Sequence, residues 1–573
     1  MGISPAIFSS AGKTSQHLIP GVYSRNKNVG SSTGVSTGNL AIIGASTGGE
    51  PLKLLGFSDK SEAKEVLISG NLLDGVAHAF SGSNSYTPQS VYAVRVNNGT
   101  KSRRFLNKGD TPIIEVESAG YGTRNNLIKL WFARSQTSGY EISVSYKENT
   151  LIVSNIEKPS ISILYTGESE RANCTISNGK MTLVSFAESV ETEKVEIDFT
   201  EFDTLDALVS RINNTDVYIA TLIDVAPNTP SNELDAVENI SIAENSAVVF
   251  HSDVQAIIDA LKSIQYIGNV SLINGAERIV PDVDSSYVYL SGAENGTETV
   301  GDYIKALEVL EKEDIQIIAT PSTNPDVLAL IVDHCIQMNS ISNKKERTFW
   351  VAAADGTSID DGIKMARGLN TEIGSLVITG ATASNPITGS TENISPALLA
   401  CKCAGIESAI GLSMPLTNKP INVSAFSQKY SNTELETMIK NGIVPFGTND
   451  NGEYVCIRNL TTYQGDSLLM NERSMVRSVL FMDRDLRMTF SSRVGTNEAP
   501  SESEIIQILR AKAAEWYSMD LITKSESGDN VFNIKVRFDG DKTYLSFDRY
   551  IRAPNNFMFI TNTNRVYSSS IEI

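Results

Sequence analysis

Short apolar runs alternate with segments of helical pattern between residues 315 and 415, and this alternation constrains the fold more than any other feature. After the first run, Asn324 can cap a helix whose first turn holds Pro325. The second run begins at Thr348 and the third at Ser375, and each is also followed by a helical segment. Short continuous apolar runs between helices of ten or more residues are typical of parallel strands buried on both faces. We therefore predict a βαβ layer in this region.

The acidic residues are concentrated in one part of the chain. The 573 residues carry a formal net charge of −19, and segment 185–314 alone holds 26 Asp and Glu against 6 Lys and Arg. The remainder is close to neutral. This distribution predicts a separate acidic module that faces solvent, and its sign argues against nucleic acid as a partner. The length of the chain predicts two to four domains.

Other segments differ in pattern from the βαβ layer. Residues 1–39 are rich in Gly, Ser, Thr and Asn without a persistent period, which predicts an extended arm. Residues 40–99 have the pattern of a small α/β unit. Residues 100–200 contain alternating strand patterns separated by turn residues, as in an all-β insertion. Near the C-terminus, a capped helix over 503–517 precedes well-alternating strands, so we expect an edge strand close to the chain end.

Patterns for membrane insertion and for a bound cofactor are weak. No window approaches eighteen consecutive apolar residues, and the first ten residues lack a basic region followed by an apolar stretch, so we expect no membrane insertion and no secretory signal. The five cysteines lie mostly inside apolar patterns and are expected to be reduced core residues. On a helix, the sulfurs of Cys401 and Cys403 would point to different sides, which does not suit a metal. We expect no cofactor, no metal site and no catalytic residue.

One segment offers an enzymatic alternative. Gly44-Ala45-Ser46-Thr47-Gly48 fits the pattern of a nucleophile elbow and follows an apolar run, so a serine hydrolase is a competing hypothesis. The elbow should lead directly into a helix, but Pro51 and further loop intervene. A hydrolase also needs a late histidine base, and no histidine follows His334. A second alternative is a carbohydrate-binding or adhesive virion protein, based on the β-rich region 100–265.

The arm and the terminal strands favour an assembly subunit over an enzyme, because free strand edges and arms recruit partners through main-chain hydrogen bonds. Their order along the chain also resembles a known family, the contractile tail sheath proteins of bacteriophages. The resemblance rests on Pro20-Gly21-Val22-Tyr23 in the arm, the apolar run Leu40 to Gly44, the segments Phe57 to Glu62, Leu72 to Phe80 and Val91 to Val96, and the later segments Ser395 to Ala400, Asn441 to Pro445 and Arg473 to Arg477.

The resemblance implies a multidomain α/β and α+β fold, in which N- and C-terminal parts form a core sheath domain around an inserted β-rich domain. On this chain it implies an N-terminal arm at 1–39, the first part of the α/β core at 40–99, a β-rich acidic outer domain at 100–265, an α/β domain with parallel-type strands at 266–420, and a C-terminal α+β core domain with a terminal exchange strand at 421–573.

The resemblance also implies roles for particular residues. In sheath proteins an N-terminal arm and a C-terminal strand join the sheet of neighbouring subunits. Carried onto this sequence, the exchanged arm is Pro20, Gly21, Val22 and Tyr23, the donated strand is Phe557, Phe559, Ile560 and Val566, and the accepting sheet is Ile534, Val536, Phe538, Tyr544, Leu545 and Phe547. A helix facing the tube would present Gln507, Arg510 and Lys512.

The implied partners are further copies of the chain in hexameric rings that stack into a helical sheath, a tail tube protein, and baseplate and tail terminator proteins. Contraction of such a sheath would drive the tube through the host envelope. The implied location is the virion, with assembly in the cytoplasm of the host bacterium.

Overall fold

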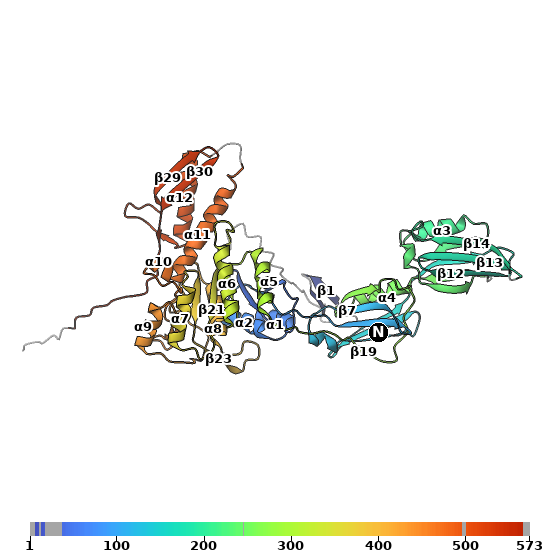
Figure 1. The fold of residues 1–573 in the computed structure, drawn as a ribbon, viewed down its shortest axis with the longest axis horizontal. Coiled ribbons are helices and arrows are strands. Elements are labelled where there is room, and N and C mark those ends of the chain that lie inside the picture. Colours follow the sequence, from blue (N-terminus) through green and yellow to red (C-terminus); the bar gives the residue numbers. More distant parts are fainter. Residues whose placement is uncertain are drawn as a thin grey trace, which may run out of the picture. The chain divides into compact units, whose positions relative to one another are not determined.

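The computed structural model describes residues 6–10, 13–17, 37–188, 190–243, 246–495 and 500–564. The chain divides into two compact units, each with its own core. Unit 1 comprises Met1–Val29 and Gly99–Gly296, and unit 2 comprises Gly30–Asn98 and Thr297–Ile573. Figure 1 follows the chain through both.

A six-stranded sheet forms the centre of unit 2. Its strand order is β22-β21-β20-β3-β5-β4, and every neighbouring pair is parallel except β4 with β5. The bounds are β3 Leu40–Gly44, β4 Leu54–Phe57, β5 Val91–Arg95, β20 Ile317–Ala319, β21 Thr348–Ala352 and β22 Gly374–Val377. The predicted parallel layer is therefore confirmed, and the sheet also includes three strands from the N-terminal part of the chain, β3, β4 and β5.

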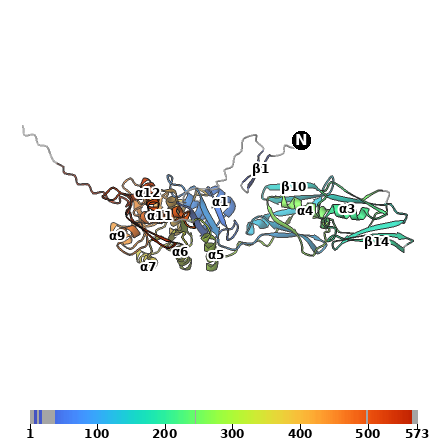
Figure 2. The ribbon, with the colours of Figure 1, turned by 90° about the horizontal axis from the view of Figure 1, so that it is seen from above.

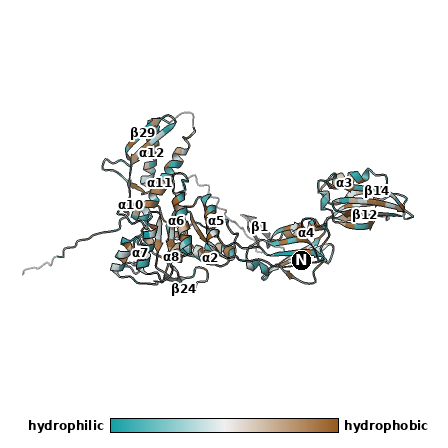
Figure 3. Ribbon diagram, in the orientation of Figure 1, coloured by the Kyte–Doolittle hydropathy of each residue, from teal (hydrophilic) through white to brown (hydrophobic). Residues whose placement is uncertain are grey.

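Helices cover both faces of this sheet. Leu40 and Ile42 of β3 lie in one core with helices α1, α2 and α8, whereas Ala41 and Ile43 lie in the other with α5, α6 and α7. This alternation follows from the period of two along a strand. The bounds are α1 Lys60–Leu67, α2 Asn71–Phe80, α5 Val300–Glu311, α6 Pro325–Met338, α7 Ile359–Leu369 and α8 Pro396–Ala409. Figure 3 shows hydrophobic colour gathered in the central strands, whereas α7 carries much hydrophilic colour.

The predicted helix starts are confirmed. The Asn324 side chain accepts a hydrogen bond from the backbone N–H of Asp326 at the start of α6, and Pro325 occupies its first turn. Ser395 caps α8 in the same way, again with a proline at the first position. Proline is tolerated there because the first backbone N–H groups of a helix have no partner within the helix.

The C-terminal part of unit 2 adds small sheets and two longer helices. Its elements are β23 Ala381–Ser384, β24 Thr391–Ile394, β25 Ala425–Phe426, α9 Asn432–Lys440, β26 Phe446–Thr448, β27 Tyr454–Cys456, α10 Leu468–Asn471, α11 Arg473–Ser491, α12 Glu502–Ser518, β28 Ile522–Thr523, β29 Phe532–Asp539, β30 Lys542–Asp548 and β31 Tyr550–Ile551. Helix α12 confirms the predicted helix over 503–517. A small core that includes Leu509 and Trp516 of α12 joins this helix to α11.

Unit 1 is rich in strands and contains two cores (Figure 2). The first core lies with sheets β10-β9-β8-β19 and β18-β7-β6 and with helix α4. The bounds are β6 Arg103–Lys108, β7 Thr111–Ser118, β8 Lys129–Arg134, β9 Tyr140–Tyr146, β10 Asn149–Ile156, α4 Asp253–Lys262, β18 Ile267–Leu272 and β19 Val288–Tyr289.

The second core of unit 1 is nested in sequence within the first. Its sheets have the orders β15-β11-β17 and β14-β13-β12-β16, and helix α3 packs with them. The bounds are β11 Pro159–Tyr165, β12 Arg171–Ser177, β13 Lys180–Ala187, β14 Val190–Asp198, α3 Leu205–Asn213, β15 Tyr218–Leu222, β16 Val237–Ser241 and β17 Val248–His251.

Two sequence expectations differ from the structure. The predicted insertion 100–265 ends too early, because β18 and β19 pair with β7 and β8 and thereby place residues 266–296 in unit 1 instead of the α/β domain. The predicted extended arm 1–39, in whose sequence no strand or helix period persists, contains a hairpin, in which β1 Ala6–Ser10 pairs with β2 Lys13–His17. Both differences come from strands too short or too polar to be recognised without their partner.

Candidate assembly surfaces

The hairpin of β29 and β30 contains all six residues predicted to form an accepting sheet. Val536 pairs with Leu545 and Phe538 with Thr543 in an antiparallel register. Ile534, Leu545 and Phe547 pack against the core between α11 and α12. Beyond the end of that core, Phe538 and Tyr544 are each 44% exposed. The hairpin therefore has one face packed on the core of unit 2 and two exposed aromatic side chains close to its polar turn at 540–541.

Both outer edges of this hairpin are open among the described residues, since β29 and β30 pair only with each other there. An unpaired strand edge presents a row of N–H and C=O groups to which another strand can bind. The edges are flanked by charged side chains, including Lys535, Arg537 and Lys542, which disfavour unspecific pairing. The geometry of the hairpin suits the addition of a strand.

The segment after β31 is exposed and apolar. Phe557, Met558, Phe559 and Ile560 are exposed by 64%, 75%, 93% and 81%, and none of them lies in a strand. In Figures 1 and 2 this part of the chain runs away from the helices of unit 2. The predicted terminal strand is thus not paired within its own subunit, as far as the segment is described. Val566 lies outside the described residues.

The N-terminal arm residues Pro20, Gly21, Val22 and Tyr23 also lie outside the described residues. On helix α12, Gln507 and Arg510 are exposed, as expected for a contact surface. Lys512 differs, because its ammonium group donates to Asp485 of α11 at 3.2 Å and to Glu515 at 2.8 Å. Lys512 therefore contributes to the packing of α12 on α11, and the role of all three residues in a contact with the tube stays a prediction.

A buried ionic centre connects α8, α11 and the sheet. Arg473 donates to both carboxylate oxygens of Glu407, at 2.7 and 2.9 Å, and the indole N–H of Trp350 donates to the same carboxylate at 2.7 Å. Arg477 donates to the backbone carbonyl of Glu407 at 3.0 Å. Burial would raise the pKa of Glu407, but the two guanidinium groups lower it below its usual value, so the carboxylate is ionised.

This ionic centre fixes the start of α11 relative to the sheet. Arg473 also donates to the carbonyl of Phe349 at 2.8 Å and to the hydroxyl of Ser375 at 3.1 Å, which lie on β21 and β22. The segment from Arg473 to Arg477 stands out in the sequence, but Glu407 does not, because it has the local pattern of a surface glutamate. A buried glutamate needs such a partner, and the two arginines were the available signal.

The geometry at Ser46 does not support the hydrolase alternative. Ser46 is buried, its hydroxyl donates to the carbonyl of Gly48 at 2.7 Å, and its N–H donates to the side chain of Asn97. Among the described side chains, His78 and His251 contact carboxylates, and His334 contacts Arg347. The serine is thus part of a strand-to-loop turn. The carbohydrate-binding alternative for unit 1 stays a hypothesis.

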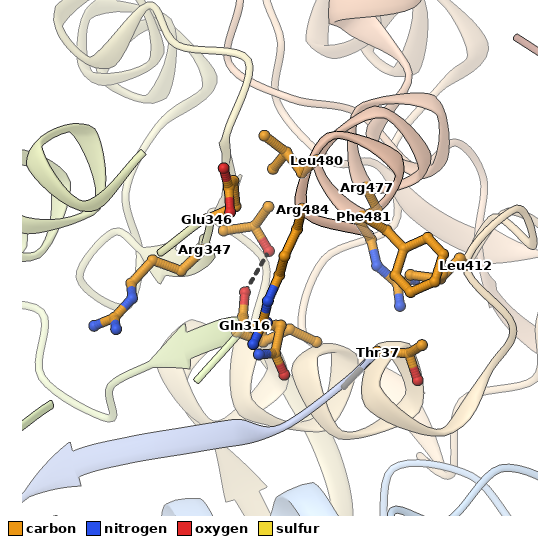
Figure 4. A pocket seen from close by; sticks show the side chains of 11 residues that line it. Thr37, Gln316, Glu346, Arg347, Leu412, Arg477, Leu480, Phe481 and Arg484 are labelled. Carbon is orange, nitrogen blue, oxygen red and sulfur yellow. Dashed lines mark hydrogen bonds between the residues drawn. The ribbon is translucent and has the colours of Figure 1, made fainter. Parts of the chain in front are cut away.

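A pocket beside α11 is small. It has a volume of about 30 Å³ and is lined by residues that include Thr37, Gln316, Glu346 and Arg477 (Figure 4). A space of this size holds one water molecule, and the Nη1 atom of Arg477 has no other hydrogen-bond partner. The cavity suits a bridging water better than an organic substrate.

The described residues offer neither a metal-binding cluster nor a membrane-spanning helix. No group of three or more His, Cys, Asp or Glu side chains there is arranged to hold a metal ion. In the same part of the chain, no helix is both long enough and apolar enough to cross a membrane.

Comparison with known proteins identifies similar chains. The phage tail sheath protein central domain family matches residues 296–462. A protein described as a tail sheath protein of Enterococcus phage phiEF24C is 22% identical over 512 residues, which cover 84% of this chain and 85% of that protein. The tail sheath protein of Staphylococcus phage Twort is 27% identical over 229 residues, which cover 39% of this chain and 38% of that protein.

The fold is also similar to that of a solved structure. The crystal structure of a sheath tail protein from Desulfitobacterium hafniense aligns with a TM-score of 0.50 at 13% identity and covers 93% of this chain and 100% of that one. At this identity the similarity concerns the fold. It extends over both units.

Proposed function

Because this chain belongs to the phage tail sheath protein family, we propose that it polymerises around a tail tube by exchanging strands between subunits. A tail sheath protein is a structural component of the virion, and the chain is accordingly a structural subunit and not an enzyme. The observation that carries the proposal is the pair of complementary elements in unit 2, an open hairpin and an exposed apolar C-terminal segment.

The C-terminal segment of one subunit would add to the edge of β29 or β30 in another. Burying Phe557, Phe559 and Ile560 would contribute about 1.5–3 kcal/mol for each side chain. Ordering costs about 1–2 kcal/mol for each residue, or about 11–22 kcal/mol for an exchanged segment 557–567. The apolar gain of about 4.5–9 kcal/mol alone does not exceed this cost. Main-chain hydrogen bonds and simultaneous exchange with several neighbours must add to it, which favours a polymer over an isolated pair.

The N-terminal arm at 18–28 would make a second link of the same kind. Helix α12 would then face the tube through Gln507 and Arg510, which are exposed. During contraction the folded units would move as rigid bodies while the exchanged segments act as hinges. The acidic residues of unit 1 would lie on the outside of the sheath, where like charges keep neighbouring filaments apart.

The partners in this proposal are further copies of the chain in hexameric rings, the tube protein, and the baseplate and terminator proteins at the two ends. Assembly would take place in the cytoplasm of the host bacterium, and the product would be part of the phage tail. Contraction would convert an extended sheath into a shorter one and drive the tube through the host envelope.

Electron microscopy of the purified full-length protein tests the proposal. We expect tubular polymers from the native chain and none from the variant Phe559→Asp, because a charge there would be buried in the neighbouring sheet. Ile341→Asp is the matched control, since Ile341 is 92% exposed and lies in a loop after α6. Removal of residues 1–28 should also prevent tubes. Tubes that persist after loss of both terminal segments would contradict strand exchange.

A further inference from the structure

Residues 552–557, which we call the root of the C-terminal segment, are held to the rest of unit 2 by few contacts. The backbone N–H of Arg552 donates to the carbonyl of Leu521 at 3.0 Å. Further along, the side-chain amide of Asn556 donates to Glu472 at 3.1 Å, and the ring of Phe557 lies beneath the guanidinium of Arg458 at 5.7 Å. The exposed apolar residues begin here, so these contacts decide where the free part of the segment starts.

Glu472 is an unusual partner for such a contact. Its side chain is fully buried at the start of α11, and its Oε1 atom has no hydrogen-bond partner. Burial raises the pKa of Glu472 to about 7. A buried carboxylate with one unpartnered oxygen is costly unless another cation or donor can reach it.

Arg458 is that second donor. Its Nε atom lies 3.9 Å from Oε2 of Glu472, about 1 Å beyond ordinary hydrogen-bond distance, and it has no hydrogen-bond partner. The same oxygen accepts from Asn556. Departure of Asn556 would leave this oxygen available to Arg458, and a small movement of the guanidinium would complete the bond. The carboxylate would then remain paired.

We propose that Glu472 is a two-position latch for the C-terminal segment, bound to Asn556 while the segment is docked and to Arg458 when a neighbouring subunit withdraws it. This deepens the strand-exchange proposal and rests on it. The latch would hold the root of the segment in a free subunit, and it would let the root go without leaving an unpaired buried charge.

Surrounding groups are consistent with a site that changes partners. Asn459 is buried, and neither polar atom of its side chain has a hydrogen-bond partner. The buried hydroxyl of Ser474, on the first turn of α11, interacts with Glu472 and lowers the pKa of its carboxyl. The N–H of Arg473 donates to the carbonyl of Asn459 at 3.3 Å, which ties this segment to α11. Polar groups that lack partners in one arrangement can gain them in another.

Limited chymotrypsin cleavage of the full-length chain tests the docked state. The measured quantity is the cleavage rate after Phe557 divided by the rate after Phe559, so that each molecule supplies its own reference. Loss of a hydrogen bond to a charged group corresponds to a change of about tenfold, so Asn556→Ala should raise the ratio by about that factor. Asn555→Ala is the control, because Asn555 is exposed, and it should leave the ratio unchanged.

The released state is tested through the rate of tube formation. Arg458→Met keeps an apolar contact for Phe557 but removes the second partner of Glu472, so tubes should form more slowly while the cleavage ratio stays low. Adding Glu472→Gln to this variant removes the charge and should restore the rate. A raised ratio in Arg458→Met, or no rescue by the second substitution, would overturn the latch.

The two proposals fail in different ways. If tubes still form without both residues 1–28 and residues 557–573, strand exchange itself is wrong. If tubes are lost there, but Asn556→Ala and Arg458→Met both behave as the native chain, only the latch is wrong.

Discussion

Replacing Arg473 by methionine would remove the central cation of the ionic cluster in unit 2. Arg473 is fully buried and makes five hydrogen bonds, two to Glu407 and the others to Phe349, Ser375 and Thr348. Its guanidinium also lies 4.7 Å from the ring centre of Trp350. Methionine can fill part of the space but donates none of these bonds.

The expected cost follows from what remains around Glu407. Trp350 still donates to its carboxylate, but the nearest cation is then Arg477, whose Nε lies 3.7 Å away. Breaking a buried ion pair by removing one partner costs about 3–5 kcal/mol. We therefore expect Arg473→Met to lower the free energy of unfolding of unit 2 by about that amount. The double variant with Glu407→Leu should recover only part of the loss, because it removes the unpaired carboxylate but leaves the buried Arg477 without its acidic partner and Trp350 without its acceptor.

Urea titration followed by hydrogen exchange measures the two units separately in the full-length chain. Peptides of unit 2 should lose protection at lower urea in Arg473→Met, and peptides of unit 1 should not change. Arg484→Met is the matched control on the same helix, because Arg484 pairs with the half-exposed Asp314, and a pair of this kind contributes about 0–1 kcal/mol. Equal costs for the two substitutions would refute the reasoning.

Two further predictions concern other parts of the molecule. Burial raises the pKa of Asp235 from 3.8 to about 7, so the folded unit 1 binds the carboxyl proton of Asp235 more tightly than the unfolded chain does. The free energy of unfolding of unit 1 should therefore fall as the pH rises from about 4 to 7. Urea titrations across this pH range should show the fall, and the variant Asp235→Asn should flatten it. A Cβ atom at Gly405 of α8 would lie 2.1 Å from the carbonyl oxygen of Ala79 on α2. In thermal unfolding, Gly405→Ala should therefore destabilise unit 2 by about 1–3 kcal/mol. Gly368→Ala on α7 should not destabilise it, because a Cβ atom there would meet nothing within 4 Å.

Features set by neighbouring residues were predictable from the sequence. The caps at Asn324 and Ser395 and helix α12 each depend on a pattern of fewer than twenty consecutive residues, and the structure confirms them. The parallel layer follows from the repetition of such short patterns between residues 315 and 415, and it is confirmed as well. The hairpin β29–β30 alternates strongly for the same reason. The roles of this hairpin and of Phe557 in strand exchange stay predictions.

Features that depend on distant partners were not predictable. Strand β19 has two residues, Val288–Tyr289, and it becomes a strand only beside Leu130 of β8, so the boundary at 265 was wrong. The burial of Glu407 follows from Arg473, which lies 66 positions later. Likewise, the contact of Glu472 with the C-terminal segment depends on Asn556, which lies 84 positions later. In each case the local sequence pattern is ordinary, and tertiary contacts with distant residues decide the structure or the environment.

Within unit 2, the buried core and the β29–β30 hairpin that we propose for assembly should differ in stability. The sheet and the ionic cluster are deeply buried, whereas β29 and β30 form a two-stranded hairpin that is anchored on one face by Ile534, Leu545 and Phe547. A hairpin of two strands is marginally stable without further strands or packing. A neighbour that adds a strand would therefore stabilise the hairpin as well as its own terminal segment. Each added subunit would order the hairpin of the subunit to which it binds. We therefore expect the C-terminal hairpin to be more stable in the polymer than in the isolated subunit, and we expect the stability of the buried core to change little.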